Sequence, residues 1–391
     1  MRAIRNLNRS GVPRETDSFG QVSSTNSDDR RFAQFHYAGR QPFNPDHWLR
    51  EEAPQILELV GTVAPTDSTM RFNVAEEREA GLSRRRFIVA AGLGVATAVF
   101  APRLLFAQET GIVPTMINEA ARAKIEVHPL RRNISVLEGS GGNIAVLPGK
   151  GGKLLIDSGF TVSRTRIAAA LDGLSSDIVT QLINTHWHVD HTDGNAWVHS
   201  AGATITAHKN TRKRLSTSTR VEGWSYTFPP APAGAIPTTV FDDEHRVHHN
   251  DTRIALKYYG PAHTDSDISV LFEEADIIHV GDTWWNGFYP FIDYSTGGSI
   301  DGMIRATERN LTIVTDKTII IPGHGPVGNK VGLTEYHDML VAIRNNVAEL
   351  KKEGKSLSET IAAKPTAAYD GKWGQFLMTP AIFTGLVYSG V

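Results

Sequence analysis

A run of histidine and aspartate residues follows a short apolar segment near the middle of the sequence. The apolar segment comprises residues 180–183, and the side chains after it form the pattern His-x-His-x-Asp-His: His186, His188, Asp190 and His191. Side chains alternate along an extended chain, so His186 and His188 project to the same side and can reach one cation. Asp190 and His191 can reach a second cation where the chain bends. Imidazole and carboxylate groups are common zinc ligands, and the pattern therefore predicts a metal site.

Three more residues of these chemical types follow later apolar segments: His263 after 253–258, Asp282 after 277–280, and His324 after 318–321. Active sites in α/β sheets lie at the C-terminal ends of strands, so these side chains are candidates to complete the site. We expect His263 to be the third ligand of the first ion and Asp282 to bridge two ions with its two oxygens. The glycines on either side of His324 let the backbone turn tightly and bring that side chain inward.

The sequence of 391 residues contains fifteen histidines but no cysteine. The lack of cysteine excludes disulfide bonds, thiolate nucleophiles, iron–sulfur clusters and cysteine-bound zinc. The 40 lysines and arginines nearly balance the 42 acidic residues, and the formal net charge of -2 gives no reason to expect a nucleic-acid partner. A metal site in this protein must therefore use histidine and carboxylate groups, and we expect its substrate to be a small molecule.

Short apolar segments alternate with helical stretches beyond residue 108. Strands are predicted at 134–137, 143–147, 153–156, 180–183, 203–206, 253–258, 268–272, 277–280 and 318–321. Helices are predicted at 161–174 and 334–351, and the second has its apolar residues on one face and Gly354 after its end. This alternation of strands and helices predicts an α/β layered protein.

The N-terminal part of the chain has a different character. Residues 1–69 are mostly polar and are expected to be a disordered extension, or the result of a mis-assigned start if translation begins at Met70. In residues 70–107, Arg84, Arg85 and Arg86 precede an uncharged run of about 16 residues, short of the ~20 that span a bilayer. This order is typical of a twin-arginine signal. We therefore expect the twin-arginine export machinery as a partner, a periplasmic or secreted location, no stable membrane span, and a mature domain at 108–391.

With these motifs, the sequence resembles the metallo-β-lactamase-fold hydrolases, a superfamily that includes glyoxalase II and the acyl-homoserine lactonases. The resemblance covers roughly Ile125 to Glu353. The family's motifs occur in the family's order, beginning with the strand end at residues 155–159 (Leu-Ile-Asp-Ser-Gly) and continuing through the His186 motif to His324. The resemblance implies a single domain folded as a four-layer αββα sandwich.

The resemblance also implies two sets of metal ligands: His186, His188 and His263 for one ion, and Asp190, His191 and His324 for the other. Asp282 is then the bridging ligand, and Asp157 supports the ligands by hydrogen bonding to them. The cofactors implied are two zinc ions, with iron or mixed metals left open. Asp190 and Asp282 are the candidate catalytic residues.

The reaction implied is hydrolysis at a carbonyl group. A hydroxide shared by the two ions would attack the carbonyl carbon of an ester, lactone, thioester or lactam, and Asp190 would orient the nucleophile and pass its proton on. Two cues about the substrate disagree. Histidine-only lactamases of the family generally lack an aspartate at the position of Asp282, which favours glyoxalase II or lactonase chemistry, whereas twin-arginine export is more typical of lactamase-like members.

Two other functions are compatible with the same scaffold. In persulfide dioxygenases, two histidines and one aspartate hold a single iron, and this redox enzyme is the main alternative. The flavodiiron branch has glutamate where His188 stands, so His188 argues against that branch. A non-catalytic binding module would usually have lost some of the ligands, all of which are present here.

Aromatic residues near the motifs leave further alternatives open. Trp285 and Tyr289 follow Asp282 and either contact the substrate or pack in the core. The proline-rich residues 224–237 form either a loop over the site or a plain connector. His279 is three residues from Asp282 on the same predicted strand, so we expect it on the opposite face and not as a ligand.

Overall fold

The computed structural model describes residues 111–391, and the predicted extension at 1–69 and predicted signal at 70–107 lie outside this range. Two main sheets and a small hairpin form the β structure. The first sheet contains β1 (Glu126–Pro129), β2 (Ser135–Glu138), β3 (Ile144–Leu147), β4 (Lys153–Ile156), β5 (Val179–Ile183), β6 (Thr204–His208) and β9 (Thr239–Phe241), in that spatial order. The second contains β10 (Glu244–His249), β11 (Thr252–Tyr258), β12 (Ile268–Phe272), β13 (Ile277–His279) and β14 (Ile319–Ile321). The hairpin pairs β7 (Thr219–Val221) with β8 (Tyr226–Phe228).

The strand pairing brings several C-terminal strand ends to one edge of each sheet. In the first sheet, β1 to β4 pair antiparallel, whereas β4, β5, β6 and β9 run parallel. In the second sheet the neighbours are antiparallel except β13 and β14, which run parallel. The loops after β4 and β5 therefore emerge together, and so do those after β13 and β14.

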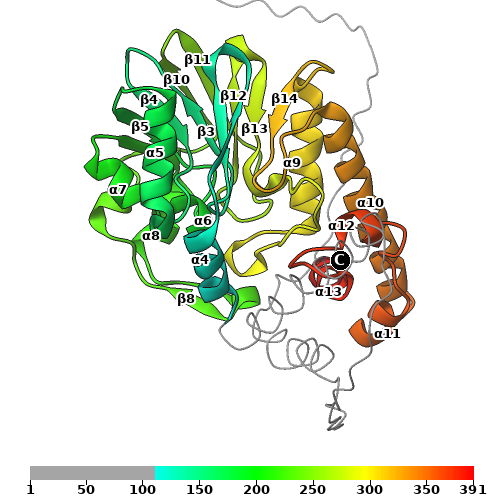
Figure 1. Cartoon of the computed structure of the whole chain (residues 1–391). Helices are drawn as coiled ribbons and strands as arrows, with labels where there is room; N and C mark the ends of the chain where they lie inside the picture. The colour runs from blue at the N-terminus through cyan, green and yellow to red at the C-terminus, as the bar shows by residue number, and fades with distance from the viewer. Residues whose placement is uncertain (1–110) are drawn as a thin grey trace, which may run out of the picture. The chain divides into compact units, whose positions relative to one another are not determined.

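The helices of the described residues are α4 (Ile112–Arg122), α5 (Arg164–Leu174), α6 (Val189–Thr192), α7 (Asn195–Ser200), α8 (Lys209–Ser216), α9 (Ile300–Ile313), α10 (Lys330–Lys352), α11 (Leu357–Ala362), α12 (Asp370–Trp373) and α13 (Pro380–Gly390). Short 3-10 turns connect several elements, and η3 (Glu222–Trp224), η6 (Gly281–Thr283) and η7 (Tyr294–Thr296) lie beside the site described below. Figure 1 shows α5, α7 and α8 on one side of the sheets and α9 and α10 on the other.

Side-chain alternation along the strands explains the layering. Leu154 and Ile156 of β4 pack between the two sheets, whereas Leu155 faces the helical layer that contains α5. In the second sheet, Ile277 points into the core between the sheets, and Ile278 packs toward α9 and α10. Because both faces of such a strand are buried, its residues form a continuous apolar run in the sequence. The predicted α/β class and four-layer αββα sandwich are confirmed.

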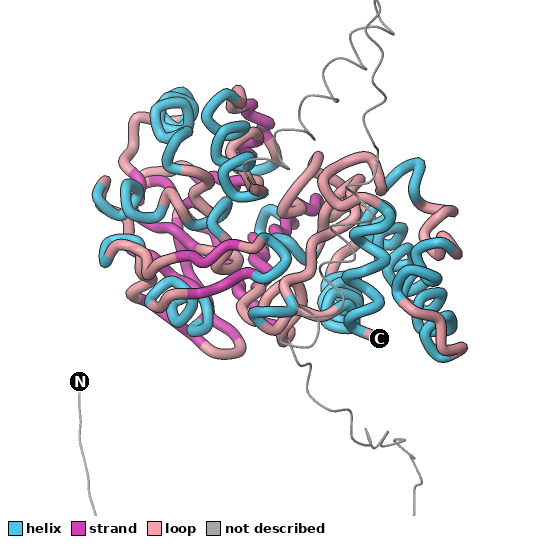
Figure 2. Tube along the Cα trace, turned by 90° about the horizontal axis from the view of Figure 1, so that it is seen from below, coloured by secondary structure: helices cyan, strands magenta, loops and turns pink. Residues whose placement is uncertain are grey.

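The C-terminal helices extend the core on the α10 side (Figure 2). The ring of Tyr289 stacks on Phe383 of α13 at 4.6 Å, and its backbone N–H donates to the Trp373 carbonyl at 2.8 Å. These contacts attach residues 369–391 to the loop that follows Asp282. Within residues 111–391, no helix is both long and apolar enough to span a bilayer.

Most of the predicted elements are present with small shifts. The strands predicted at 153–156 and 268–272 coincide with β4 and β12. The long helix begins at Lys330 rather than 334, because the Asn329 side chain accepts a hydrogen bond from the Gly332 N–H and caps an earlier turn. Helix α9 and the C-terminal helices were not predicted, since their apolar residues are interrupted by glycine, proline and threonine.

Candidate metal centre

Asp157 organises the edge of the first sheet where β4 and β5 end. This residue adopts a left-handed backbone conformation, with φ of 65°, directly after β4. Its Oδ1 accepts from the Thr185 N–H at 2.8 Å, and its Oδ2 accepts from the Thr185 hydroxyl at 2.7 Å. The same Oδ2 lies 2.8 Å from His191 Nδ1. Asp157 thus fixes both the start of the histidine motif and the ring of His191, the supporting role that the resemblance implied.

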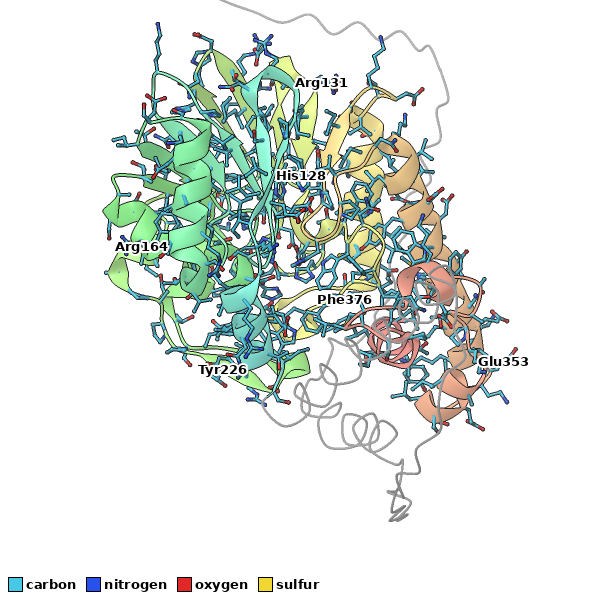
Figure 3. All side chains as sticks on the ribbon, in the orientation of Figure 1. His128, Arg131, Arg164, Tyr226, Glu353 and Phe376 are labelled. Carbon is cyan, nitrogen blue, oxygen red and sulfur yellow. The ribbon has the colours of Figure 1, made fainter. Side chains whose placement is uncertain are left out.

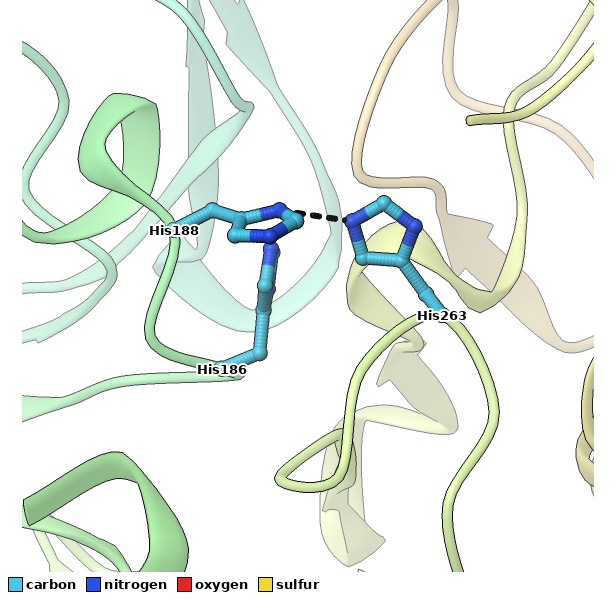
Figure 4. Close-up of side chains that lie close together, drawn as sticks. All are labelled: His186, His188 and His263. Atoms are coloured by element: carbon cyan, nitrogen blue, oxygen red, sulfur yellow. Dashed lines mark hydrogen bonds between the residues drawn. The ribbon is translucent and has the colours of Figure 1, made fainter. Parts of the chain in front are cut away.

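Three histidines form the first group of candidate ligands, and Figure 4 shows their rings turned toward one another. His186, His188 and His263 are fully or almost fully buried, and their ligand atoms lie within 4.8 Å of one another. His188 Nδ1 and His263 Nε2 are 2.8 Å apart. His186 and His188 come from the loop after β5, and His263 comes from the turn after β11. The predicted same-side projection of His186 and His188 agrees with this geometry.

Each ring of this first group uses its other nitrogen for a fixed hydrogen bond. His186 Nδ1 lies 3.0 Å from the Thr185 hydroxyl, and His263 Nδ1 lies 2.7 Å from the Phe291 carbonyl. His188 Nε2 lies 3.1 Å from Asp293 Oδ2. Such contacts set the ring orientation and the tautomer of metal-binding histidines. The nitrogens left to face the centre are therefore His186 Nε2, His188 Nδ1 and His263 Nε2.

Asp190, His191 and His324 form the second group, and their ligand atoms again lie within 4.8 Å of one another. Asp190 Oδ2 is 3.2 Å from His324 Nε2 and 3.6 Å from His191 Nε2. Helix α6 carries Asp190 and His191, and the turn after β14 carries His324. The side chain of His324 is 17% exposed, the most of the three, so this group lies nearest to solvent.

Asp282 lies between the two groups. Its Oδ1 is 3.0 Å from His191 Nε2, and its Oδ2 is 3.3 Å from both His263 Nε2 and His324 Nε2. The Trp285 indole N–H donates to Oδ2 at 3.0 Å and holds the carboxylate in place. A Cβ added at Gly323 would lie only 1.9 Å from Asp282 Oδ1, so glycine is required there for the carboxylate to sit against the chain.

The chemistry of these donor atoms fits divalent cations. Four of the buried inward atoms have no hydrogen-bond partner among the described residues: His186 Nε2, His191 Nε2, His324 Nε2 and Asp282 Oδ1. Buried polar atoms without partners are costly, and cations bound at the two groups would satisfy all four. Nitrogen and carboxylate oxygen donors suit zinc and related metals. The residues present can therefore hold a metal in either group.

The histidine pKa shifts have opposite directions in the two groups. Burial lowers the pKa of His186 and lowers that of His263 to about 4, so both rings are neutral at ordinary pH. Burial alone would also lower the pKa of His324, but the carboxylates of Asp282 and Asp190 outweigh it and raise the pKa to about 9. The pKa of His191 is raised for the same reason, against burial, by Asp282, Asp190 and Asp157.

These pKa shifts predict that metal is lost in two steps as the pH falls. A metal displaces a proton from His324 at any pH below about 9 and also competes with a proton on His191, whose pKa is raised, so binding at the second group weakens early on acidification. In the first group, burial lowers the pKa of His186, and the His263 ring stays neutral until the pH approaches 4. Equilibrium dialysis against zinc from about pH 8 to pH 5 should show two ions per chain falling to one. Simultaneous loss of both ions would contradict this assignment.

Asp293 is a candidate supporting residue that the sequence did not single out. It is buried, it contacts His188 through Oδ2, and it accepts from the Thr296 hydroxyl at 2.6 Å. His188 and Asp293 are 105 residues apart, and no spacing rule connects them. The available signal was an aspartate followed by Ser295 and Thr296, a combination that forms a local turn.

We expect Asp293→Ala to weaken metal binding about 10- to 100-fold, because His188 loses the partner that orients its ring. Asp301→Ala is the control, since Asp301 is paired with Arg344 on α10 away from the cluster. Zinc competition with a chromophoric chelator would measure both variants. Equal affinity in Asp293→Ala and Asp301→Ala would remove Asp293 from the site.

Three aromatic predictions have different outcomes. Trp285 lies at the site, with its ring 4.4 Å from that of His324. Tyr289 does not, because its hydroxyl donates to Asp370 at 2.9 Å and its ring is buried against α13; it is a core residue and not a pocket residue.

The segment 224–237 contacts the site at its first residue, where the Trp224 ring lies 4.6 Å from that of His188. His279 belongs to none of the possible ligand groups among the described residues, and its Nε2 lies 3.0 Å from the Asn143 carbonyl.

Comparisons with solved structures give several matches of low sequence identity. DIM-1 metallo-beta-lactamase is 20% identical with a TM-score of 0.45, over 56% of this chain and 97% of that chain. A metallo-beta-lactamase from Pontibacter korlensis is 16% identical with a TM-score of 0.45, over 56% and 99%. The stereoselective inverting sec-alkylsulfatase Pisa1 from Pseudomonas sp. is 13% identical with a TM-score of 0.52, over 70% of this chain and 52% of that chain. The last match supports a shared fold.

The family model described as the metallo-beta-lactamase superfamily matches residues 137–324. This range is narrower than the predicted 125–353, but it includes Asp157 and all of the candidate ligands. The superfamily assignment supports the predicted enzyme class, a metal-dependent hydrolase. The chain thus contains a domain of the metallo-β-lactamase superfamily, and its cluster of histidines and aspartates lies within that domain.

Proposed function

We propose that this protein is a dinuclear, zinc-dependent hydrolase that cleaves an ester, lactone, thioester or lactam. One observation carries the proposal: two groups of three candidate ligands lie on either side of a single carboxylate, Asp282, which contacts members of both. Such an arrangement suits a pair of cations about 3.5–4 Å apart.

Bound divalent cations would polarise the carbonyl oxygen of the substrate and lower the pKa of a water molecule. The protein supplies the remaining functions. Asp190 is placed to orient the water and accept its proton, because its Oδ2 faces the centre beside His324. Asp282 is held in one orientation by the Trp285 indole, and the histidine rings are held by Thr185, Asp293 and Phe291. This pre-organisation reduces the reorganisation needed during the reaction.

The alternative with one iron uses two histidines and one aspartate. A single ion held by His186, His188 and Asp282 would leave the second group without a metal ion. That group comprises Asp190, His191 and His324. The presence of both groups favours a dinuclear hydrolase over the hypothesis of a persulfide dioxygenase. Zinc as the metal and export to the periplasm by the twin-arginine machinery remain parts of this proposal.

The proposal is tested by removing and restoring the metal. Protein treated with a strong chelator should lose activity toward a panel of carboxylic esters, lactones, thioesters and β-lactams, and zinc should restore activity toward at least one class. The panel includes an aryl sulfate, because one structural neighbour is described as an alkylsulfatase. Restoration by iron alone together with oxygen consumption would overturn the proposal, as would hydrolysis that is indifferent to the chelator.

A further inference from the structure

Aromatic side chains flank the candidate metal centre on two sides. On the His188 side are Trp224, Tyr226 and Phe228, which we call the hairpin aromatics because they lie on or beside β7–β8. The Trp224 and His188 rings are 4.6 Å apart, and Trp224 and Tyr226 both lie within about 6 Å of Phe228, at 6.1 and 4.7 Å. The hairpin therefore places an apolar surface directly beside one end of the cluster.

On the His324 side are Trp285, Phe288 and Phe376, which we call the loop aromatics. The Trp285 ring is 4.4 Å from that of His324, and the Phe288 ring packs against Gly325, the residue after His324. The Phe376 ring lies 4.8 Å from that of Phe288 and is 45% exposed. The loop aromatics thus begin at Trp285, which contacts the buried Asp282 carboxylate, and end at the exposed Phe376 on the C-terminal segment.

Both groups of aromatics lie at the metal end of the sheets. Arg131 marks the other end, because its guanidinium donates to the carbonyls of Asp276 and Lys317, which precede β13 and β14. Asp282 and His324 follow those strands. In Figure 3, Phe376 and Tyr226 both lie toward the end of the molecule opposite to Arg131. Phe376 is thus exposed at the same end of the sheets as the cluster.

The charges around the cluster come from its own members. The groups that act most strongly on the pKa values of Asp190, Asp282 and His324 are one another and the neighbouring histidines, with no lysine or arginine among them. The nearby cationic side chains have other partners: Arg214 pairs with Asp265 and Arg305 donates to the carbonyls of Tyr259 and Pro261. The guanidinium groups of Arg214 and Arg305 are therefore already engaged by the protein.

We propose that the site accepts neutral esters or lactones whose acyl part carries an aromatic or branched apolar group, and that this group lies against Phe288 and Phe376. This inference rests on the proposed hydrolase function. The reaction adds water across the acyl C–O bond: the acyl carbon gains the water oxygen, and the departing oxygen takes a proton to become an alcohol. The carboxylic acid product releases its remaining proton to solvent.

The test compares three 4-nitrophenyl esters with the zinc-loaded protein: the acetate, the 3-phenylpropanoate and the hemisuccinate, which carries a free carboxylate. We expect kcat/KM to be highest for the phenylpropanoate and at least about tenfold lower for the hemisuccinate. Phe376→Ala should raise KM for the phenylpropanoate about tenfold and leave the acetate within about twofold. Ile178→Ala is the control, since it removes an exposed apolar side chain just before β5, at the other end of the sheet.

The outcomes separate the inference from the function on which it rests. A preference for the hemisuccinate, or an equal effect of Phe376→Ala on acetate and phenylpropanoate, would overturn the inference while zinc-dependent hydrolysis stands. Hydrolysis of none of the three esters would overturn it as well, and the lactones, thioesters and β-lactams of the wider panel would then decide whether the proposed function survives.

Discussion

His188→Ala is expected to remove the metal of the first group and to lower turnover by a factor of at least about a thousand. The substitution takes away His188 Nδ1, which lies 2.8 Å from His263 Nε2 at the centre of that group. The first ion would keep only His186, His263 and the shared carboxylate of Asp282, having lost one of its three histidine ligands. The protein should still fold, because the cores on both sides of each sheet do not depend on this ring.

Metal content, circular dichroism and turnover of the variant would be measured together. His337→Ala is the matched control, since His337 is a half-buried histidine of α10 that contacts Glu308 on α9 and Asp338 and belongs to neither ligand group. The control should keep full metal content and activity. Wild-type turnover in a folded His188→Ala protein would remove the first group from the mechanism.

Asp157→Ala is expected to reduce both stability and metal affinity. Its loss leaves the Thr185 N–H, the Thr185 hydroxyl and His191 Nδ1 without their partner in a fully buried place. Alanine is also strained at a φ of 65°. We expect the free energy of unfolding to fall by about 4 kcal/mol. Zinc affinity of the second group should fall about 10- to 100-fold, because His191 is no longer oriented.

Two further variants make this result interpretable. Asp193→Ala removes an exposed aspartate at the same sheet edge, where it accepts from the Thr161 N–H at 2.7 Å, and it should leave metal affinity unchanged. Asp157→Asn tolerates the left-handed backbone and retains an acceptor for Thr185, so it should fold even if the alanine variant does not. Wild-type zinc affinity in a folded Asp157→Asn protein would contradict the role assigned to the carboxylate.

The candidate ligands could be singled out from the sequence because each of them follows a predicted strand. Strand direction and side-chain alternation are local properties, so the sequence alone predicted that His186 and His188 would point the same way. The apolar segments before His263, Asp282 and His324 are β11, β13 and β14 or lie close to their ends. The resemblance to a known superfamily then supplied the grouping into two sets, which the distances between ligand atoms agree with.

The contacts that orient the ligands were harder to predict because they join distant parts of the chain. Asp293 reaches His188 across 105 residues, and Trp285 reaches Asp282 by turning back within a short aromatic loop. Tyr289, in that same loop, has a similar side chain but a different partner, since α12 and α13 bury it. Only the tertiary packing distinguishes Trp285 from Tyr289, and no periodicity in the sequence carries that information.

The metal content of the purified protein tests the central claim most directly. Elemental analysis of protein produced without added chelator should give about two divalent ions per chain, with zinc the main element. Loss of one ion from His188→Ala and of none from His337→Ala would show that the metal ions counted are bound by the histidine and aspartate cluster. A single iron per chain, or a fully folded and active protein with no metal, would contradict the account.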